Sequence, residues 1–208
     1  MGPRGRARCR ALLDAAAALF MEKGYDQTTL SDIVSRAGGS RATLYEHFGD
    51  KAGLFRAMME EHNARFLTSL SALTISTSEP PEAALTRFGL HFLHTLMEPK
   101  TAAILRTLVS EGTRIPDIAA SFFRIGPDIV SSRFADDLRR LAEAGTLRIP
   151  DPEAAAHAFI GMIIGSLLLP RLVLPNAAVC DAELERHVRQ AVALFLDGTR
   201  AAPGDGTG

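Results

Sequence analysis

Apolar residues recur every three to four positions along most of the chain, which is the spacing of a helix with one buried face. This pattern predicts about nine helices, near 8–23, 29–37, 40–48, 50–73, 82–98, 104–112, 116–144, 152–169 and 182–196. Glycine, proline or short polar runs separate them, as expected for turns and loops. No stretch has the pattern of a strand, so an all-α fold is expected.

Two of these helices have distinctive features. Pro127 falls inside the segment 116–144, where its missing N–H and its clash with the preceding turn should kink or break the helix. The helix 152–169 is apolar nearly all round, so we expect it to be buried on more than one side. Gly161 and Gly165 lie one turn apart on it and would allow another helix to approach closely.

The segment 28–51 predicts two short helices joined by a tight turn, with a third helix beginning just beyond. Thr29 can cap the first helix, and Ser40 can cap the second. The Gly-Gly pair at 38–39 ends the first helix and permits the positive φ values of a sharp corner. Two helices across such a turn form a helix-turn-helix, whose second helix fits the DNA major groove.

These motifs resemble the TetR family of transcriptional regulators. The resemblance begins in the preceding helix, LLDAAAALFMEKGYDQTTLSDIVSRAG, and continues through ATLYEHFGDKAGLF, which covers about the first quarter of the chain. It rests on the order of an apolar helix, Phe-x-x-x-Gly-Tyr, Thr-Thr, Ala-Gly and Leu-Tyr-x-x-Phe-x-x-Lys. Two residues depart from the pattern. Gly53 replaces a residue that is often acidic, and Glu46 places a negative charge on the second helix of the pair, 40–48, which we call the reading helix.

The resemblance implies a division of the chain into domains. Residues 1–50 would form a three-helix helix-turn-helix DNA-binding domain with a basic N-terminal arm. A long connector helix would join it to a helical ligand-binding and dimerisation domain over residues 51–200. Residues 201–208 are rich in glycine and are expected to form a disordered tail.

Specific DNA recognition needs side chains that reach base edges, flanked by groups that contact phosphates. Arg41 could donate two hydrogen bonds to guanine, and the methyl group of Thr43 could contact thymine. The resemblance implies that Tyr45 and Lys51 contact phosphates. In the alternative interpretation, Tyr45 is a half-buried core residue and Arg41 is a solvated surface charge. The predicted DNA-contacting residues are Thr28, Thr29, Ser40, Arg41, Thr43, Tyr45, His47 and Lys51.

The net charge of the chain is −1 at pH 7, which argues against a protein that coats nucleic acid in bulk. The distribution of charge is more informative than its sum. Arg4, Arg6, Arg8 and Arg10 all precede the first acidic residue, Asp14. Such a basic arm would be attracted to phosphates or would reach into a groove; equally, it could be a disordered, solvated N-terminus.

Other classes of protein fit the sequence less well. The cysteines, Cys9 and Cys180, have no metal-like spacing, so neither a disulfide, a metal site nor another cofactor is expected. The N-terminus is unlike a secretory signal, and the longest apolar run, 158–169, is shorter than the roughly 20 residues of a membrane span. A cytoplasmic protein is therefore expected. No nucleophile elbow, phosphate loop or array of carboxylates indicates an enzyme.

A single reading unit buries little surface, so helix-turn-helix proteins usually bind a two-fold DNA site as dimers. Helices 152–169 and 182–196 could form a four-helix bundle with a second copy, or they could bury only against their own domain. The excess of apolar surface in 159–169 favours the dimer. The predicted interface residues are Phe159, Ile160, Ile164, Leu167, Leu184, Val188, Val192 and Phe195.

Aromatic, sulfur-containing and polar residues are mixed among apolar ones in the middle helices, as in small-molecule pockets. By themselves such stripes usually form plain core, but the family resemblance implies a pocket. The candidate ligand-binding residues are His91, His94, Met97, Arg106, Phe122, Phe123, His157 and Met162.

The sequence therefore predicts a homodimeric regulator of a two-fold operator in double-stranded DNA. It is expected to be a repressor that a small apolar or amphipathic ligand releases from the operator. Control by a protein partner, or no control at all, remains the alternative.

Overall fold

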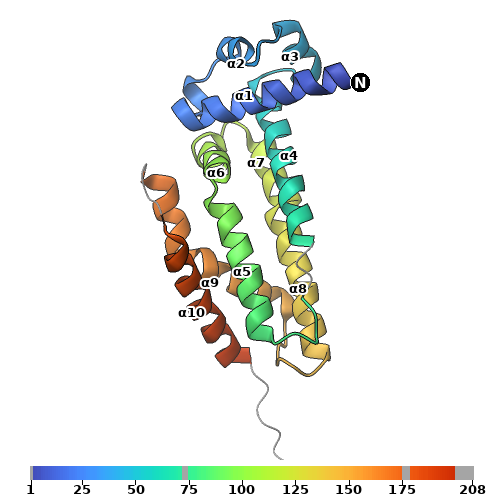
Figure 1. Ribbon diagram of the computed structural model, residues 1–208, viewed down its shortest axis with the longest axis vertical. Helices are drawn as coiled ribbons and strands as arrows, with labels where there is room; N and C mark the ends of the chain where they lie inside the picture. The colour runs from blue at the N-terminus through green and yellow to red at the C-terminus, as the bar shows by residue number, and fades with distance from the viewer. Residues whose placement is uncertain (1, 72–74, 175–178, 200–208) are drawn as a thin grey trace, which may run out of the picture. The chain divides into compact units, whose positions relative to one another are not determined.

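The computed structural model describes residues 2–71, 75–174 and 179–199, and all the regular elements in these ranges are helices (Figure 1). The predicted all-α fold is confirmed. The predicted disordered tail, 201–208, lies outside the described residues. The helices are α1 (Pro3–Gln27), α2 (Leu30–Ala37), α3 (Arg41–Phe48), α4 (Lys51–Ser71), α5 (Pro81–Met97), α6 (Pro99–Glu111), α7 (Pro116–Ile125), α8 (Pro127–Glu143), α9 (Pro152–Val173) and α10 (Asp181–Thr199).

The tenth helix arises because the predicted segment 116–144 is two helices. Gly126 leaves the helical region, with φ −125° and ψ −90°, and Pro127 becomes the first residue of α8. Proline is tolerated at this position because its missing N–H would have no partner within the helix. Pro127 therefore breaks the segment, which was one of the two outcomes predicted for it.

The described chain forms two compact units. The first contains the chain up to Arg65 together with Glu98–Ile125, and the second contains Phe66–Met97 together with the chain from Gly126 onward. This division differs from the predicted boundary at residue 50, because α6 and α7 are grouped with the helix-turn-helix. The predicted division of roles, DNA binding by 1–50 and ligand binding by 51–200, stays a prediction.

The core of the first unit brings together residues of α1, α2, α3, α4, α6 and α7. Phe20, Tyr25 and Phe55 form an aromatic cluster with ring centroids 5.1–6.1 Å apart. Ile33 of α2 and Leu44 of α3 are the buried residues that hold the two short helices on this core. The packing of these apolar side chains supplies what the short helices lack in intrinsic stability.

The core of the second unit joins one phenylalanine from each of four helices. Phe88 of α5 stacks on Phe134 of α8 at a centroid distance of 4.2 Å. Phe159 of α9 lies 5.1 Å from Phe134 and 5.0 Å from Phe195 of α10. Gly89 allows α5 to pack closely, because a Cβ at this position would lie 2.8 Å from Cγ1 of Val188.

The predicted dimer residues are mostly part of this core, which corrects their assignment. Six of them are buried within the second unit, so they cannot contact a second copy, and only Ile160 and Ile164 are partly exposed. For these six, the alternative of burial against their own domain holds, because the apolar stripe faces α5 and α8. The buried six are Phe159, Leu167, Leu184, Val188, Val192 and Phe195.

Helix α9 is longer than predicted. It has 22 residues and passes through Pro170, and it is long and apolar enough to span a membrane by length and composition alone. That is weak evidence for a membrane span, because the core helix of a soluble protein meets the same criteria. Phe159, Ile163 and Leu167 of α9 are buried on one side of the helix against other helices of its unit. Only 22% of the apolar window is buried, so the prediction that this helix is buried on more than one side is wrong for the protomer.

Candidate nucleic-acid interface

Capping side chains define the start of α2. The Thr29 hydroxyl accepts a hydrogen bond from the Asp32 backbone N–H at 3.2 Å, and the Asp32 carboxylate accepts one from the Thr29 N–H at 2.9 Å. This reciprocal pair is a capping box, which satisfies two donors that the helix itself leaves unpaired. Gly38 ends α2 in the left-handed conformation, with φ 65°. The predicted cap and the predicted turn are both confirmed.

Helix α3 begins in the same way. Ser40 is its N-cap and accepts a hydrogen bond from the backbone N–H of Thr43 at 3.2 Å. The hydroxyls of Ser40 and Thr43 lie 3.0 Å apart, so they are hydrogen-bonded to each other. Leu44 is buried and Phe48 is partly buried against the core, as their spacing predicted. The reading helix is therefore fixed by a cap at one end and by apolar anchors on its inner face.

Two ion pairs join α2 to α1. Lys23 Nζ lies 2.7 Å from the Asp32 carboxylate, and an Arg36 nitrogen lies 2.7 Å from the Glu22 carboxylate. The hydrogen bond from Lys23, followed by those from Thr29, holds the pKa of Asp32 well below its ordinary value. Both pairs are exposed, so each contributes little to stability and serves mainly to orient the helix.

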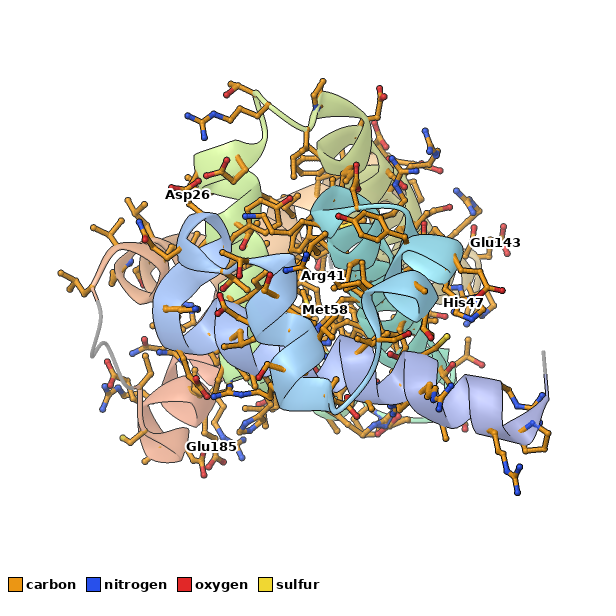
Figure 2. The ribbon with its side chains drawn as sticks, turned by 90° about the horizontal axis from the view of Figure 1, so that it is seen from above. Asp26, Arg41, His47, Met58, Glu143 and Glu185 are labelled. Atoms are coloured by element: carbon orange, nitrogen blue, oxygen red, sulfur yellow. The ribbon has the colours of Figure 1, made fainter. Side chains whose placement is uncertain are left out.

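The surface of the α2–α3 pair presents most of the predicted DNA-contacting side chains to solvent. Thr29, Ser40, Arg41, Tyr45 and His47 are all exposed, and Thr43 is half-buried. Figure 2 looks down on this region and labels Arg41 and His47. Tyr45 is 55% exposed and is not among the residues packed against the core of its unit, which argues against the alternative that it is a core residue. Arg41 donates a hydrogen bond to the Ser31 hydroxyl of α2, so its guanidinium is held beside the pair.

Thr28 and Lys51 do not belong to this surface, which corrects two predicted DNA contacts. Thr28 is only 1% exposed, and its hydroxyl donates to the Gly24 carbonyl at 2.7 Å. Lys51 Nζ donates to the carbonyls of Tyr25, Asp26 and Thr28 at 2.9–3.3 Å. These bonds use the three donors of an ammonium group, and Nζ also lies 4.3 Å from the Tyr25 ring centroid. The side chain of Thr28 is therefore bonded within the end of α1, and Lys51 fastens that end to the start of α4.

Two residues of the exposed surface of α3 were not predicted as DNA contacts. Ala42 and Glu46 are exposed and lie one turn apart. At about 100° per residue, they lie on the side of α3 opposite Leu44 and Phe48. The spacing of the buried residues was the signal in the sequence that could have identified them.

A polar cluster lies where α1, α4 and α6 meet within the first unit. Glu61 of α4 accepts hydrogen bonds from Arg10 of α1 and from Arg65 one turn further along α4. His62 Nε2 lies 2.8 Å from the hydroxyl of Thr101 of α6. Burial, together with the charges of Lys100 and Arg65, lowers the pKa of His62 to about 4. The cluster thus joins a helix of the DNA-binding region to two helices that follow it.

The predicted ligand-binding residues do not all belong to the same unit. Arg106, Phe122 and Phe123 are in the first unit, and the other five are in the second. Phe123, His94 and His157 are exposed, and at the surface they cannot enclose a ligand. His91 is hydrogen-bonded to Ser69 at 2.8 Å. The assignment of a pocket to this set stays a prediction.

Within the described ranges, no group of three or more His, Cys, Asp and Glu side chains is placed to hold a metal ion. The exposed region around α3 is instead suited to hydrogen bonding. It presents hydroxyls, a guanidinium and a phenol on two helices whose backbone positions are fixed by caps. Donors of this kind contact phosphates and base edges in duplex DNA.

Comparison with known proteins agrees with this geometry. The transcriptional regulator YvkB of Bacillus subtilis is 26% identical over 194 residues, which cover 92% of this chain and 97% of YvkB. The crystal structure of a TetR-family regulator from Mesorhizobium loti has a TM-score of 0.87 at 26% identity and covers 96% of this chain and 100% of its own. The complex of SmeT, a repressor from Stenotrophomonas maltophilia, with triclosan has a TM-score of 0.71 at 26% identity and covers 97% and 96%.

Two family models match separate parts of the chain. Residues 12–58 match the model of bacterial regulatory proteins of the tetR family. Residues 83–198 match the C-terminal domain of AefR-like transcriptional repressors, and this match alone spans more than half of the chain. The cap-fixed helix pair, the all-α fold and these two matches show that the chain belongs to the TetR family of helix-turn-helix transcriptional regulators.

Proposed function

We propose that this TetR-family regulator is a repressor, which binds a two-fold operator as a homodimer and is released by a small apolar or amphipathic ligand. The observation that carries the DNA-binding part is the set of exposed polar side chains along α3. Ser40, Arg41 and Tyr45 extend from a helix whose start is capped and whose inner face is buried. Such a helix can enter the major groove without rearranging its backbone.

The exposed residues suggest a division of roles in DNA binding. Arg41 lies at the first position of α3, where recognition helices contact base edges, and its guanidinium can form two hydrogen bonds with guanine. Tyr45 and Thr29 carry hydroxyls suited to phosphate oxygens. His47 is an additional candidate for backbone contact near the end of α3. The hydroxyl of Thr43 is hydrogen-bonded to Ser40, which leaves its methyl group for the proposed contact with thymine.

The dimer surface that we propose is the outward side of α9 and α10, rather than the buried stripe. Gly161, Gly165 and Leu169 are exposed at four-residue spacing along α9. A Cβ added at either glycine would meet nothing within 4 Å, which leaves room for a second helix. Leu194 of α10 is 68% exposed. A two-fold partner would cover these apolar side chains and would place two reading helices on one duplex.

A shallow depression of about 450 Å³ lies along the exposed side of α10 and is lined by residues of that helix alone. Its lining includes Glu185, Arg186 and Arg189. In an isologous interface the same surface meets itself, so charges of both signs on one surface can pair across the two-fold axis.

Repression and ligand control are supported by the relatives. The family model that matches residues 83–198 describes repressors, and SmeT, a similar structure, is a repressor whose complex with triclosan has been solved. A ligand that binds the DNA-free conformation more tightly than the DNA-bound conformation would lower the affinity for the operator. The decrease is set by the ratio of the ligand's affinities for the two conformations.

The proposal can be tested by selection from a random duplex library with the purified protein, followed by footprinting on genomic DNA. We expect enrichment of an inverted repeat and protection of sites upstream of genes. A ligand that releases the selected DNA should also raise the melting temperature, because it binds the folded state. If no sequence is enriched at physiological salt, the DNA-binding proposal is wrong.

A further inference from the structure

The outermost residue of the reading helix is an acid. Within α3, Leu44 and Phe48 are the residues packed against the core. At about 100° per residue, the direction opposite them is occupied by Glu46, with Ala42 one turn earlier beside it. Arg41, three residues before Leu44 and seven before Phe48, lies on the same side as these residues and is hydrogen-bonded to α2. A groove that receives the outer side of α3 therefore meets Ala42 and Glu46 first.

The carboxylate of Glu46 makes no hydrogen bond or ion pair with any other residue that the structure describes. It differs in this from Glu22 and Asp32 nearby, which are paired with Arg36 and Lys23. Its role is therefore not explained by the packing of the DNA-binding unit. On a surface that approaches a polyanion, an unpaired carboxylate weakens binding unless it meets a hydrogen-bond donor.

The major groove offers few such donors. A carboxylate only accepts hydrogen bonds, and the donors on the base edges are the amino groups of cytosine and adenine, whereas guanine N7 and O6 and thymine O4 are acceptors. Adenine is read best by a side chain that both donates and accepts, because its N7 lies beside its amino group. A carboxylate is therefore best matched to N4 of cytosine.

We infer that Glu46 is a specificity-determining residue, which accepts a hydrogen bond from N4 of one cytosine in each half-site and repels other sequences. The small side chain of Ala42 allows the helix to approach closely enough for this contact. Repulsion from phosphates and from acceptor edges lowers the affinity for non-operator DNA, and specificity gained by such repulsion is common in selective interfaces. The inference rests on the proposed function, because it requires α3 to enter the major groove.

The test compares sequences selected from a random duplex library by the wild-type protein, Glu46→Gln, Glu46→Ala and a control, Glu60→Gln. Glu60 is an exposed glutamate of α4 in the same unit. We expect the wild-type protein and the control to select cytosine at one position of each half-site. Glu46→Gln should select adenine there, because glutamine can both donate and accept. Glu46→Ala should select no base at that position.

A second measurement tests the proposed repulsion between Glu46 and DNA that lacks the operator sequence. Fluorescence anisotropy on one random-sequence duplex should show Glu46→Ala binding about tenfold more tightly than the wild-type protein, while Glu60→Gln binds within about twofold of it. Melting temperatures check that the variants are folded. Unchanged base preference in both Glu46 variants overturns the inference while the proposed function stands. If the wild-type protein itself enriches no sequence, the proposed function fails and this inference fails with it.

Discussion

At the scale of single residues, exposure separates the two interpretations of Tyr45 but not those of Arg41. The alternative for Tyr45 was a half-buried core residue, whereas the alternative for Arg41 was a solvated surface charge, which is exposed as well. Tyr45 is 55% exposed although it is a large aromatic residue, and Arg41 lies at the first position of a capped helix. The phenol of Tyr45 is therefore available for contact with a phosphate.

We expect Tyr45→Ala to weaken DNA binding about equally for all sequences, because a phosphate contact carries no sequence information. Arg41→Ala should weaken binding to the selected operator by about 1–3 kcal/mol and also relax preference at one base pair. Anisotropy titrations on the operator and on random duplex measure both effects. A uniform loss for Arg41→Ala, or no loss for Tyr45→Ala, would reverse these assignments.

Lys51 is a second case, in which the structure changes the expected role of a residue. Its ammonium group donates to three carbonyls at the end of α1. Lys51→Ala should therefore lower the free energy of unfolding, by about 1.5–3 kcal/mol for the loss of charge-assisted hydrogen bonds. Urea unfolding measures this change. A variant of normal stability with much weaker DNA binding would instead restore Lys51 as a phosphate contact. Arg56→Ala, at an exposed arginine of α4, is the matched control.

At the scale of elements, the contact of α1, α4 and α6 depends on polar residues that could be identified only in three dimensions. His62 pairs with Thr101 across two helices, and its pKa is lowered to about 4, mainly by burial. Below pH 6.5 the unfolded chain binds a proton at this histidine that the folded protein does not bind. Stability should therefore fall as the pH drops from about 6.5 to 4, and this histidine should have no such effect above that range.

Replacing His62 with Gln should make stability less dependent on pH in this window. Because His62 is only partly buried, we expect its contribution to be at most about 2 kcal/mol. Urea unfolding at pH 7 and pH 5 compares the wild-type protein, His62→Gln and His47→Gln, which removes an exposed histidine instead. An identical loss of stability in all three proteins would show that other groups account for the pH dependence.

At the scale of the whole molecule, the proposed function requires two copies to present their reading helices to one duplex. The buried stripe of α9 and α10 is used within the protomer, so the apolar surface that remains is on the outer side of these helices. Leu169 and Leu194 are each more than 60% exposed. An exposed apolar surface of this kind commonly marks an interface between proteins.

Gly165→Arg should give monomers in sedimentation velocity experiments at micromolar concentration, because it places a long charged side chain where a second helix would pack. The fold should tolerate the change, since the position is open in the protomer. Ser132→Arg, at an exposed position of α8, should leave the dimer intact. A Gly165→Arg protein that remains dimeric would place the interface elsewhere.

The sequence by itself determined the features that depend on neighbours along the chain. Capping side chains, the glycine at the left-handed turn and the apolar spacing depend on residues only a few positions apart. The all-α fold, and the positions where α2 and α3 begin and end, could therefore be predicted from the sequence. The family could be identified for the same reason, because its motif is a continuous run of such local features.

Only the tertiary structure decided how each face is used. An apolar stripe indicates that a helix is buried, but the stripe is the same whether its partner is the same chain or a second copy, so the stripe of α10 was assigned to the wrong partner. Likewise, an ammonium group near the start of a helix can donate hydrogen bonds either to a DNA phosphate or to backbone carbonyls of the same chain. For Lys51 the choice depended on the end of α1 lying close by, which is a contact between residues about 25 positions apart.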